Sequence, residues 1–403
     1  MPRPTEHLLL RNLLEGLDRE LPRAVDLRHR LHASPELAHA EERTAEAVAA
    51  ELPVSSEPAA ATGRIARIGP SEGQPVAVRA ELDGLALDER TGAPFSAGGG
   101  VMHACGHDVH MAALVALARS AHALADELPA GLLAVFQPSE EAYPSGAEQL
   151  ARTALARARP SAVVGAHIHP ELRWGTVALD PGPINASCDY IEITVEGSPS
   201  HGAYPHRGRE PILAIAQVVV ALHARVSRTI DPLQPAVLTV GVLESGDAGN
   251  VIPAHARALA ALRAHRPEDR LTLRRMVEEV AVGVAAAHGC TASLQLEPGE
   301  PALENDPAIV SRARELFPLA ELAPAPQWRS CGSDDFAFFG ALAPLSMAFV
   351  GLDGADGFEP RPLHHPELLP PDAAVRAVAR AQAVLYLAAA WSTNPPCRQL
   401  SPS

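Results

Sequence analysis

Short apolar runs that alternate with amphipathic helices are the feature that most limits the folds open to this chain. Four strand-like runs lie at 64–69, 75–80, 131–136 and 162–166. A long apolar helix at 108–124 separates the second run from the third. Strands separated by helices usually pair in parallel, because the chain crosses back over the sheet between them. We therefore predict an α/β fold with a mainly parallel sheet, which resumes after Pro298 and ends in an Ala-rich helix near 371–391.

The pattern changes after Pro183. The expected order there is strand, helix, strand, strand, helix, strand, which is the βαββαβ arrangement of small ferredoxin-like domains. The chain length of 403 residues also fits two domains. We predict a discontinuous α/β domain over 1–185 and 298–403, a ferredoxin-like domain inserted at 186–297, and a disordered tail after Trp391.

Composition excludes several classes of protein. Hydrophobic residues make up 47% of the chain and charged residues 20%, so a large core is possible. The net charge is −15 and lysine is absent, which argues against nucleic-acid binding. Residues 1–17 are typical of an amphipathic helix rather than a signal peptide, and no stretch approaches the roughly 18 apolar residues of a membrane span. Five scattered cysteines argue against a disulfide framework, so we expect a cytoplasmic protein that does not bind membranes.

Residues 103–110, with the sequence HACGHDVH, combine a cysteine, three histidines and an aspartate at a Gly-rich loop that enters a helix. Thiolate and imidazole are ligands well suited to Zn²⁺ or a similar ion. Gly106 lets the backbone turn so that Cys105 and His107 converge. The alternative is that these histidines cap the helix or satisfy polar groups of the core.

Two adjacent carboxylates, Glu140 and Glu141, follow the strand-like run at 131–136. Neighbouring side chains at a strand end point in different directions, so one can bind a metal while the other transfers protons. His167 also follows a strand, and open α/β sheets place their sites at the carboxyl ends of strands. Two solvated loop glutamates are the alternative interpretation.

Nucleophilic catalysis has less support from the sequence. The chain lacks the G-x-S-x-G sequence of a serine hydrolase. Cys105 could act as a nucleophile beside His107, but a thiolate among several histidines and carboxylates is more readily a metal ligand.

At these residues the sequence resembles the M20 metallopeptidase family. The nearest branch is the amidohydrolases that act on N-acyl amino acids, hippurate and auxin–amino-acid conjugates. The resemblance extends from about Arg28 to Leu387. The matching segments, in chain order, are RHRLHASPELAHAEERTA, VRAELDGLALDE, MHACGHDVHMA, FQPSEEAYPSGA, GAHIHP, GSPSHGAYPHRGREPI, GDAGNVIP, GSDDFAFF and LHHP.

The resemblance implies a centre of two divalent metal ions, with Zn²⁺ favoured and Mn²⁺, Co²⁺ or Ni²⁺ as alternatives. The ligands that it implies are Cys105, His107, Glu141, His167 and His364. Glu140 would be the general base that takes a proton from water and passes it to the leaving amine. Asp83 would support the ligands from behind. The implied reaction is hydrolysis of the amide bond of an N-acyl amino acid or a similar conjugate.

The inserted domain resembles the lid or dimerisation domain of the family, so the resemblance also implies a homodimer. His201 matches a histidine that reaches the active site of the opposite subunit and helps to stabilise the oxyanion. Asn250 and Arg263 match positions associated with the substrate carboxylate or the oxyanion, and a guanidinium group pairs well with a carboxylate. A turn residue and a surface arginine are the alternative interpretations of these two positions.

A few positions depart from the family pattern. Glu81 stands where aspartate is usual, Asp334 stands where glutamate is usual, and His365 is an additional candidate ligand. These departures bear on the substrate rather than on the class of reaction. The alternatives that stay open are a dipeptidase or carboxypeptidase of the same family, a catalytically inactive metal-binding dimer, and metal ions that only hold the fold together.

Overall fold

The structure is a computed structural model that describes residues 4–393. Its internal contacts divide the chain into two compact units. The first unit comprises the residues up to Gly182, Glu304–Trp328 and the residues from Phe338 onward, and the second comprises Pro183–Leu303 and Arg329–Ala337. The predicted domain boundaries stay a prediction, and the grouping of 329–337 with the second unit is a feature that the sequence pattern did not indicate. The predicted disordered tail lies outside the described residues from Asn394 onward, and so does Cys397.

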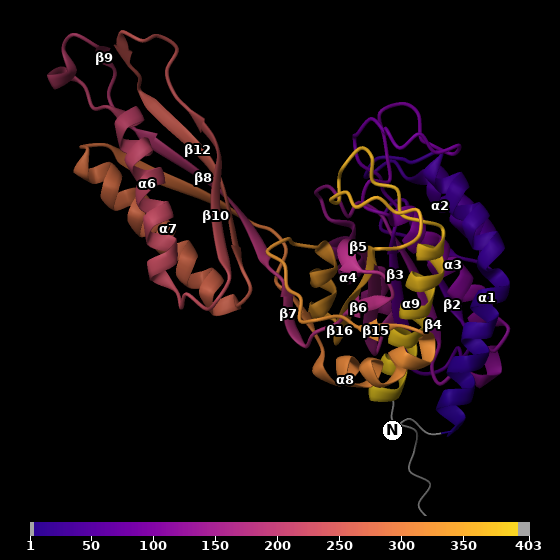
Figure 1. The fold of residues 1–403 in the computed structure, drawn as a ribbon. Coiled ribbons are helices and arrows are strands. Elements are labelled where there is room, and N and C mark those ends of the chain that lie inside the picture. Colours follow the sequence, from indigo (N-terminus) through magenta and orange to yellow (C-terminus); the bar gives the residue numbers. More distant parts are fainter. Residues whose placement is uncertain (1–3, 394–403) are drawn as a thin grey trace, which may run out of the picture. The chain divides into compact units, whose positions relative to one another are not determined.

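An eight-stranded sheet forms the centre of the first unit, with the strand order β1-β2-β4-β3-β5-β16-β6-β15 (Figure 1). Its strands are β1 (Glu57–Ala59), β2 (Gly63–Ile68), β3 (Val76–Glu81), β4 (Leu132–Gln137), β5 (Ala162–Arg173), β6 (Thr176–Ala178), β15 (Ala323–Pro324) and β16 (Leu345–Asp353). The four central strands β4, β3, β5 and β16 run parallel, whereas β1 and β2 pair antiparallel at one edge. The predicted α/β fold with a mainly parallel sheet is confirmed.

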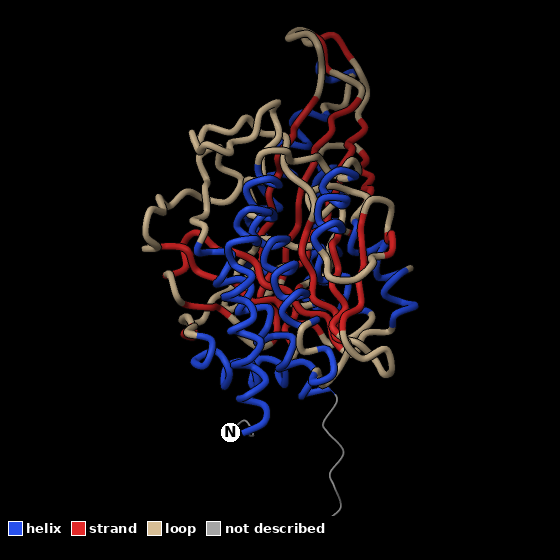
Figure 2. Tube along the Cα trace, turned by 90° about the vertical axis from the view of Figure 1, so that its right-hand side faces the viewer, coloured by secondary structure: helices blue, strands red, loops and turns tan. Residues whose placement is uncertain are grey.

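Helices and sheet share one apolar core in this unit. Its α-helices are α1 (Pro4–His32), α2 (Glu42–Glu51), α3 (His107–His122), α4 (Gly146–Arg152), α5 (Ala154–Ala158), α8 (Pro307–Leu316) and α9 (Ala373–Thr393). The long helices α1, α3 and α9 contact one another in a layer beside the strands (Figures 1 and 2). They bury every second residue of the central strands, such as Val78 and Val164, because alternate strand residues point to the same face. The opposite face of β3 and β4 ends in the polar side chains of Glu81 and Gln137, at the carboxyl ends of these strands. The prediction that His167 follows a strand is wrong, because β5 continues past this residue.

The second unit contains the predicted βαββαβ order. Its elements are β8 (Ser187–Glu196), α6 (Pro211–Thr229), β10 (Ala236–Glu244), β12 (His255–Ala264), α7 (Pro267–Ala287) and β13 (Thr291–Pro298), with short strands β9 (Ser200–His201) and β11 (Val251–Ile252). The short strands β7 (Gly182–Asn185) and β14 (Leu303–Asn305) lie at the points of the chain where one unit ends and the other begins. The sheet is antiparallel with the order β10-β12-β8-β13. Helices α6 and α7 pack against it around a separate core that includes Ile193, Val218 and Val277. The ferredoxin-like arrangement predicted for the insertion is therefore present.

Two helices, α6 and α9, are long and apolar enough to cross a membrane by length and composition alone. The prediction that no stretch approaches this length is wrong by that criterion, because a high mean hydropathy tolerates a few interspersed polar residues. The apolar window of α9 is 89% buried, and the helix belongs to the core of the first unit. Helix α6 buries one face, which includes Ile215 and Val218, against its own sheet.

Candidate metal centre

The turn at Gly106 places two of the predicted ligands. Gly106 has a φ angle of +80° and immediately precedes α3. A side chain is excluded there because this φ is left-handed and because a Cβ atom would lie 2.3 Å from Cδ1 of Ile168. The turn leaves Cys105 in the loop and His107 at the first position of the helix, and both side chains are buried.

Glu141 lies close to two other predicted ligands, Cys105 and His364, and Cys105 in turn lies close to His167. One ligand atom each of Cys105, Glu141 and His364 lie within 4.8 Å of one another. Nε2 of His364 is 3.2 Å from Oε1 of Glu141, and Sγ of Cys105 is 3.4 Å from Nε2 of His167. His364 has a φ angle of +64°, which is uncommon for a residue with a side chain, and its N–H donates to the carbonyl of Ala104 at 2.9 Å. This hydrogen bond ties the His364 loop to the loop that carries Cys105.

His107, Glu140 and Glu141 form a second group whose ligand atoms also lie within 4.8 Å of one another. Nδ1 of His107 lies 2.8 Å from the carbonyl oxygen of Asp83, which can only accept, so Nδ1 carries a proton and Nε2 is the ring nitrogen that can bind a metal. The carboxylate of Asp83 accepts from the N–H of Glu141 at 2.9 Å and lies 3.5 Å from Nδ1 of His107. Burial alone would raise the pKa of Asp83, but His107 and the backbone N–H groups outweigh it and lower that pKa. Asp83 is therefore a buried carboxylate that holds both His107 and the Glu141 loop.

The donor set fits a divalent metal ion. Nε2 of His107 is buried and has no hydrogen-bond partner among the residues that the structure describes, and it lies 3.9 Å from Oε2 of Glu140. A buried polar atom without a partner costs about 1–3 kcal/mol, which coordination of a metal would offset. Thiolate, imidazole and carboxylate together suit Zn²⁺ and the neighbouring transition metals.

Two further residues of this site, Glu81 and His110, are not among the ligands that the family resemblance implies. Glu81 and His110 place ligand atoms within 4.8 Å of those of His107 and His167, and all four residues are buried. His110 follows His107 by three positions on α3, so the two share a helix face, and this spacing is a signal that could have indicated its place. The additional candidate His365 belongs to no such group in the described part of the chain, and its Nδ1 accepts from a backbone N–H two positions later.

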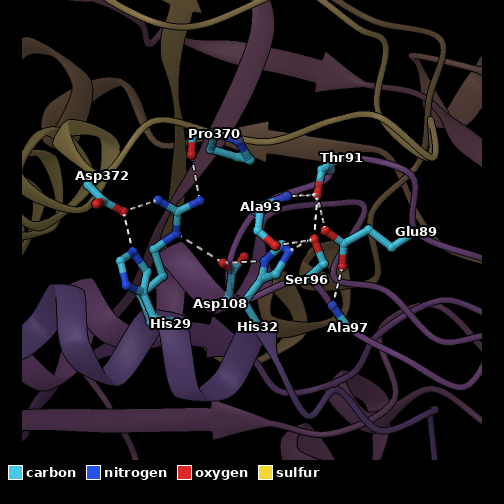
Figure 3. Close-up of polar contacts among 11 residues, drawn as sticks. His29, His32, Glu89, Thr91, Ala93, Ser96, Ala97, Asp108, Pro370 and Asp372 are labelled. Carbon is cyan, nitrogen blue, oxygen red and sulfur yellow. Dashed lines mark hydrogen bonds and ion pairs between the residues drawn. The ribbon is translucent and has the colours of Figure 1, made fainter.

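A buried network of charges anchors the start of α3 to α1 (Figure 3). Asp108, the residue after His107, is fully buried, and its Oδ2 lies 3.0 Å from both Nε of Arg28 and Nδ1 of His32. Nε2 of His32 lies 3.1 Å from Oε1 of Glu89. Burial opposes a charge on His32, but Asp108 and Glu89 outweigh it and raise the pKa of His32 to about 9. Desolvation likewise opposes the charge on Asp108, yet His32 and Arg28 hold the pKa of Asp108 well below its usual range.

Three residues that the sequence predicts to contact the substrate belong to the second unit. His201 and Asn250 are both exposed. They are neighbours in space, because β9 pairs with β11 and the N–H of Gly202 donates to the carbonyl of Asn250 at 2.7 Å. Arg263 lies on β12, and its Nη1 donates to the carbonyl of Cys331 at 3.1 Å. The roles of these three residues stay a prediction.

Known proteins resemble this chain over most of its length. The model of peptidase family M20/M25/M40 matches residues 77–386. The N-acetyl-L-cysteine deacetylase of Bacillus subtilis strain 168 is 36% identical over 362 residues, with 88% of this chain and 84% of that protein covered. The N-acetyldiaminopimelate deacetylase of Bacillus pumilus strain SAFR-032 is 32% identical over 360 residues, with 87% of this chain and 94% of that protein covered.

A solved structure from the same family shares the fold. The structure of a dinuclear metal-binding peptidase of the M20 family from Bacillus subtilis matches with a TM-score of 0.81 at 28% identity, and the match covers 92% of this chain and 98% of that one. The family resemblance predicted from the motifs is confirmed by these matches. The chain therefore belongs to peptidase family M20/M25/M40 and is a hydrolase of amide C–N bonds.

Proposed function

We propose that this protein hydrolyses the amide bond of N-acyl amino acids with the help of two divalent metal ions. The proposed ligands of the ions are Cys105, His107, Glu141, His167 and His364. The observation that carries the proposal is the convergence of thiolate, imidazole and carboxylate groups on Glu141, with Glu140 beside them. Relatives named as N-acetylcysteine and N-acetyldiaminopimelate deacetylases support N-acyl amino acids as the substrates, and the dinuclear neighbour supports two ions.

The two adjacent glutamates have separate roles in this proposal. When bound, the ions would supply the Lewis acidity that activates water and polarises the amide carbonyl. Glu140 is the general base, whose carboxylate takes a proton from the attacking water and later delivers it to the leaving nitrogen. Glu141 is held at the ligands by Asp83, which accepts from its N–H and also lies beside His107.

Cysteine chemistry bears on the metal and on the location. We propose Zn²⁺ as the resident ion, with Mn²⁺, Co²⁺ and Ni²⁺ as alternatives, because the thiolate of Cys105 favours a softer ion than Mg²⁺ or Ca²⁺. A cytoplasmic location is also part of the proposal. It is supported by the four cysteines in the described part of the chain, which form no disulfide bonds, as is usual in a reducing compartment.

Removal of the metal is expected to abolish hydrolysis. The purified protein should contain about two ions per chain and release free amino acid from a panel of N-acetyl and N-benzoyl amino acids. A chelator should stop this release, and added Zn²⁺ should restore it. Elemental analysis and an amino-acid assay provide the measurements. Undiminished hydrolysis by the metal-free protein would contradict the proposal. If the protein binds two ions but hydrolyses none of the panel, the proposed metal centre is retained and these amides are excluded as substrates.

The surface of the second unit supports a homodimer in this proposal. Strand β10 is an edge strand, and apolar side chains on β10 and α6 are exposed, among them Leu243 at 53% and Val220 at 63%. An unpaired edge strand together with exposed apolar residues is typical of a surface that binds another copy of the chain. In such a dimer, His201 would complete the site of the partner subunit, while Asn250 and Arg263 would bind the oxyanion or the substrate carboxylate.

Mixing two inactive variants is expected to restore activity. His201→Ala should lower kcat by about 10²–10³-fold through lost oxyanion stabilisation, and Glu140→Gln removes the base. In a hybrid dimer, one of the two sites would combine Glu140 of one subunit with His201 of the other. Steady-state assays after subunit exchange should therefore recover about a quarter of the wild-type activity for random pairing. The control is mass labelling, which shows whether the subunits have exchanged. If they have exchanged and no activity is recovered, the role of His201 in trans is contradicted.

A further inference from the structure

His167 presents one ring nitrogen to the ligand cluster because its other ring nitrogen is fixed. Nδ1 of His167 lies 2.6 Å from the carbonyl oxygen of Ile168, which can only accept a hydrogen bond. Nδ1 therefore carries the proton, and Nε2 keeps its lone pair at 3.4 Å from Sγ of Cys105. The tautomer of this proposed ligand thus depends on the position of the carbonyl group of Ile168.

The N–H of the same Ile168 is fixed by His110. It donates to Nε2 of His110 at 3.0 Å, so this nitrogen must be unprotonated. Nδ1 of His110 lies 2.8 Å from Oε2 of Glu81, and a carboxylate accepts only, so Nδ1 carries the proton. Both ring nitrogens of His110 therefore have partners, and these partners determine one tautomer.

Glu81 is itself held in place by an ion pair. Its other oxygen pairs with Arg79, and both side chains are buried. Nε of Arg79 donates to Oε1 of Gln137 at 2.8 Å, at the end of the neighbouring strand β4. The guanidinium group neutralises the buried carboxylate, so Glu81 remains an acceptor for His110. The glutamate found here, where aspartate is usual, holds Arg79 with one oxygen and His110 with the other.

We propose that Glu81 and His110 are positioning residues for His167. Glu81 determines the tautomer of His110, His110 holds the main chain at Ile168, and the Ile168 carbonyl determines the tautomer of His167. The inference rests on the proposed function, because it takes His167 as a metal ligand. Residues that orient a ligand in this way typically change metal affinity by about 10–100-fold.

The hydrogen bonds also argue that His110 is not a ligand itself. Glu81, His107, His110 and His167 lie close enough together to form a metal group of their own. A ligand nitrogen needs a free lone pair, however, and the lone pair of His110 is engaged by the N–H of Ile168. His110 therefore orients His167 through the main chain of β5.

The test replaces His110 in the full-length protein after removal of metal. Phenylalanine keeps a ring of similar size and removes both nitrogens, whereas glutamine restores an acceptor near the position of Nε2. The contacts that lead from Glu81 through His110 and the main chain of Ile168 to His167 are called the relay below. His169→Phe, on the same strand but outside this relay, is the matched control. The affinity for Co²⁺ is measured by competition with a chelator, followed through the absorption band of the cobalt–thiolate pair at Cys105. We expect a loss of about 10–100-fold for His110→Phe, recovery of most of it in His110→Gln, and at most about a twofold change in the control.

Three results of this titration would overturn the inference. One is a folded His110→Phe protein that binds Co²⁺ as tightly as the wild type. Another is the loss of a whole ion at saturating Co²⁺, since it would make His110 a ligand. The third is a wild-type protein that binds no Co²⁺, which would also overturn the metal centre of the proposed function and is thereby distinguishable from the first two.

A measurement on the wild type needs no variant and applies even if His110→Phe does not fold. Nitrogen NMR of the histidine rings in the metal-free protein reports which ring nitrogen is protonated. We expect the proton on Nδ1 in both His110 and His167 at neutral pH. A proton on Nε2 of His110 would leave two donors facing each other at Ile168 and would overturn the relay.

Discussion

Replacing Glu140 by glutamine is expected to lower kcat by about 10²–10⁴-fold while the metal content stays near that of the wild type. Glutamine keeps the size of the side chain but cannot take up a proton from water. Oε2 of Glu140 lies 3.9 Å from Nε2 of His107, so the carboxylate stands beside a proposed ligand without a hydrogen bond to it. Steady-state kinetics on an N-acyl amino acid, together with elemental analysis of the same samples, provide the measurement.

Glu148→Gln is the matched control for this substitution. Glu148 lies on α4, a few residues after the glutamate pair, and forms a surface ion pair with Arg152 at 2.6 Å. Its replacement should leave kcat unchanged. A Glu140→Gln protein whose kcat stays within about tenfold of the wild type would remove Glu140 from the role of base. A parallel loss of metal would instead make Glu140 a ligand.

Replacing Arg28 by methionine is expected to lower the free energy of unfolding by about 3–5 kcal/mol. The side chain of Arg28 is 1% exposed, and its Nε lies 3.0 Å from the fully buried carboxylate of Asp108 (Figure 3). Methionine fills much of the same volume but leaves Asp108 with His32 as its charged partner on α1. Because Asp108 is buried, water does not replace the lost partner, and the folded state is destabilised relative to the unfolded state. Urea unfolding of the metal-free protein at pH 7, followed by circular dichroism, measures the change.

Arg30→Met, on the same helix, is the control that distinguishes the loss of a buried charge from the loss of an exposed one. The side chain of Arg30 is 57% exposed and pairs with Glu51 at 2.6 Å. An exposed ion pair contributes about 0–1 kcal/mol, so this control should change the free energy of unfolding little. Equal effects of the two substitutions would contradict the argument that the buried network, rather than the number of ion pairs, stabilises the start of α3.

Local patterns were sufficient to predict much of the fold. The apolar runs that became β3, β4 and β5 are short, and strand periodicity is a property of neighbouring residues. The same holds for the order of elements in the second unit. The approach of Glu141 to the other proposed ligands also had a local signal, since parallel strands end at one edge of a sheet. The hydropathy of α6 and α9 was underestimated, because an uninterrupted apolar run is a stricter criterion than a high mean.

The sequence by itself determined which side chains are available for metal binding and proton transfer, because thiolate, imidazole and carboxylate chemistry belongs to the residues of the motifs. Only the tertiary structure decided which partners orient these groups. Arg28 meets Asp108 across 80 positions of the chain, and Asp83 meets Glu141 across 58. The relay that ends at His167 passes through the main chain of Ile168. Such contacts depend on the directions of hydrogen bonds between segments distant in sequence, and no local pattern of residues encodes those directions.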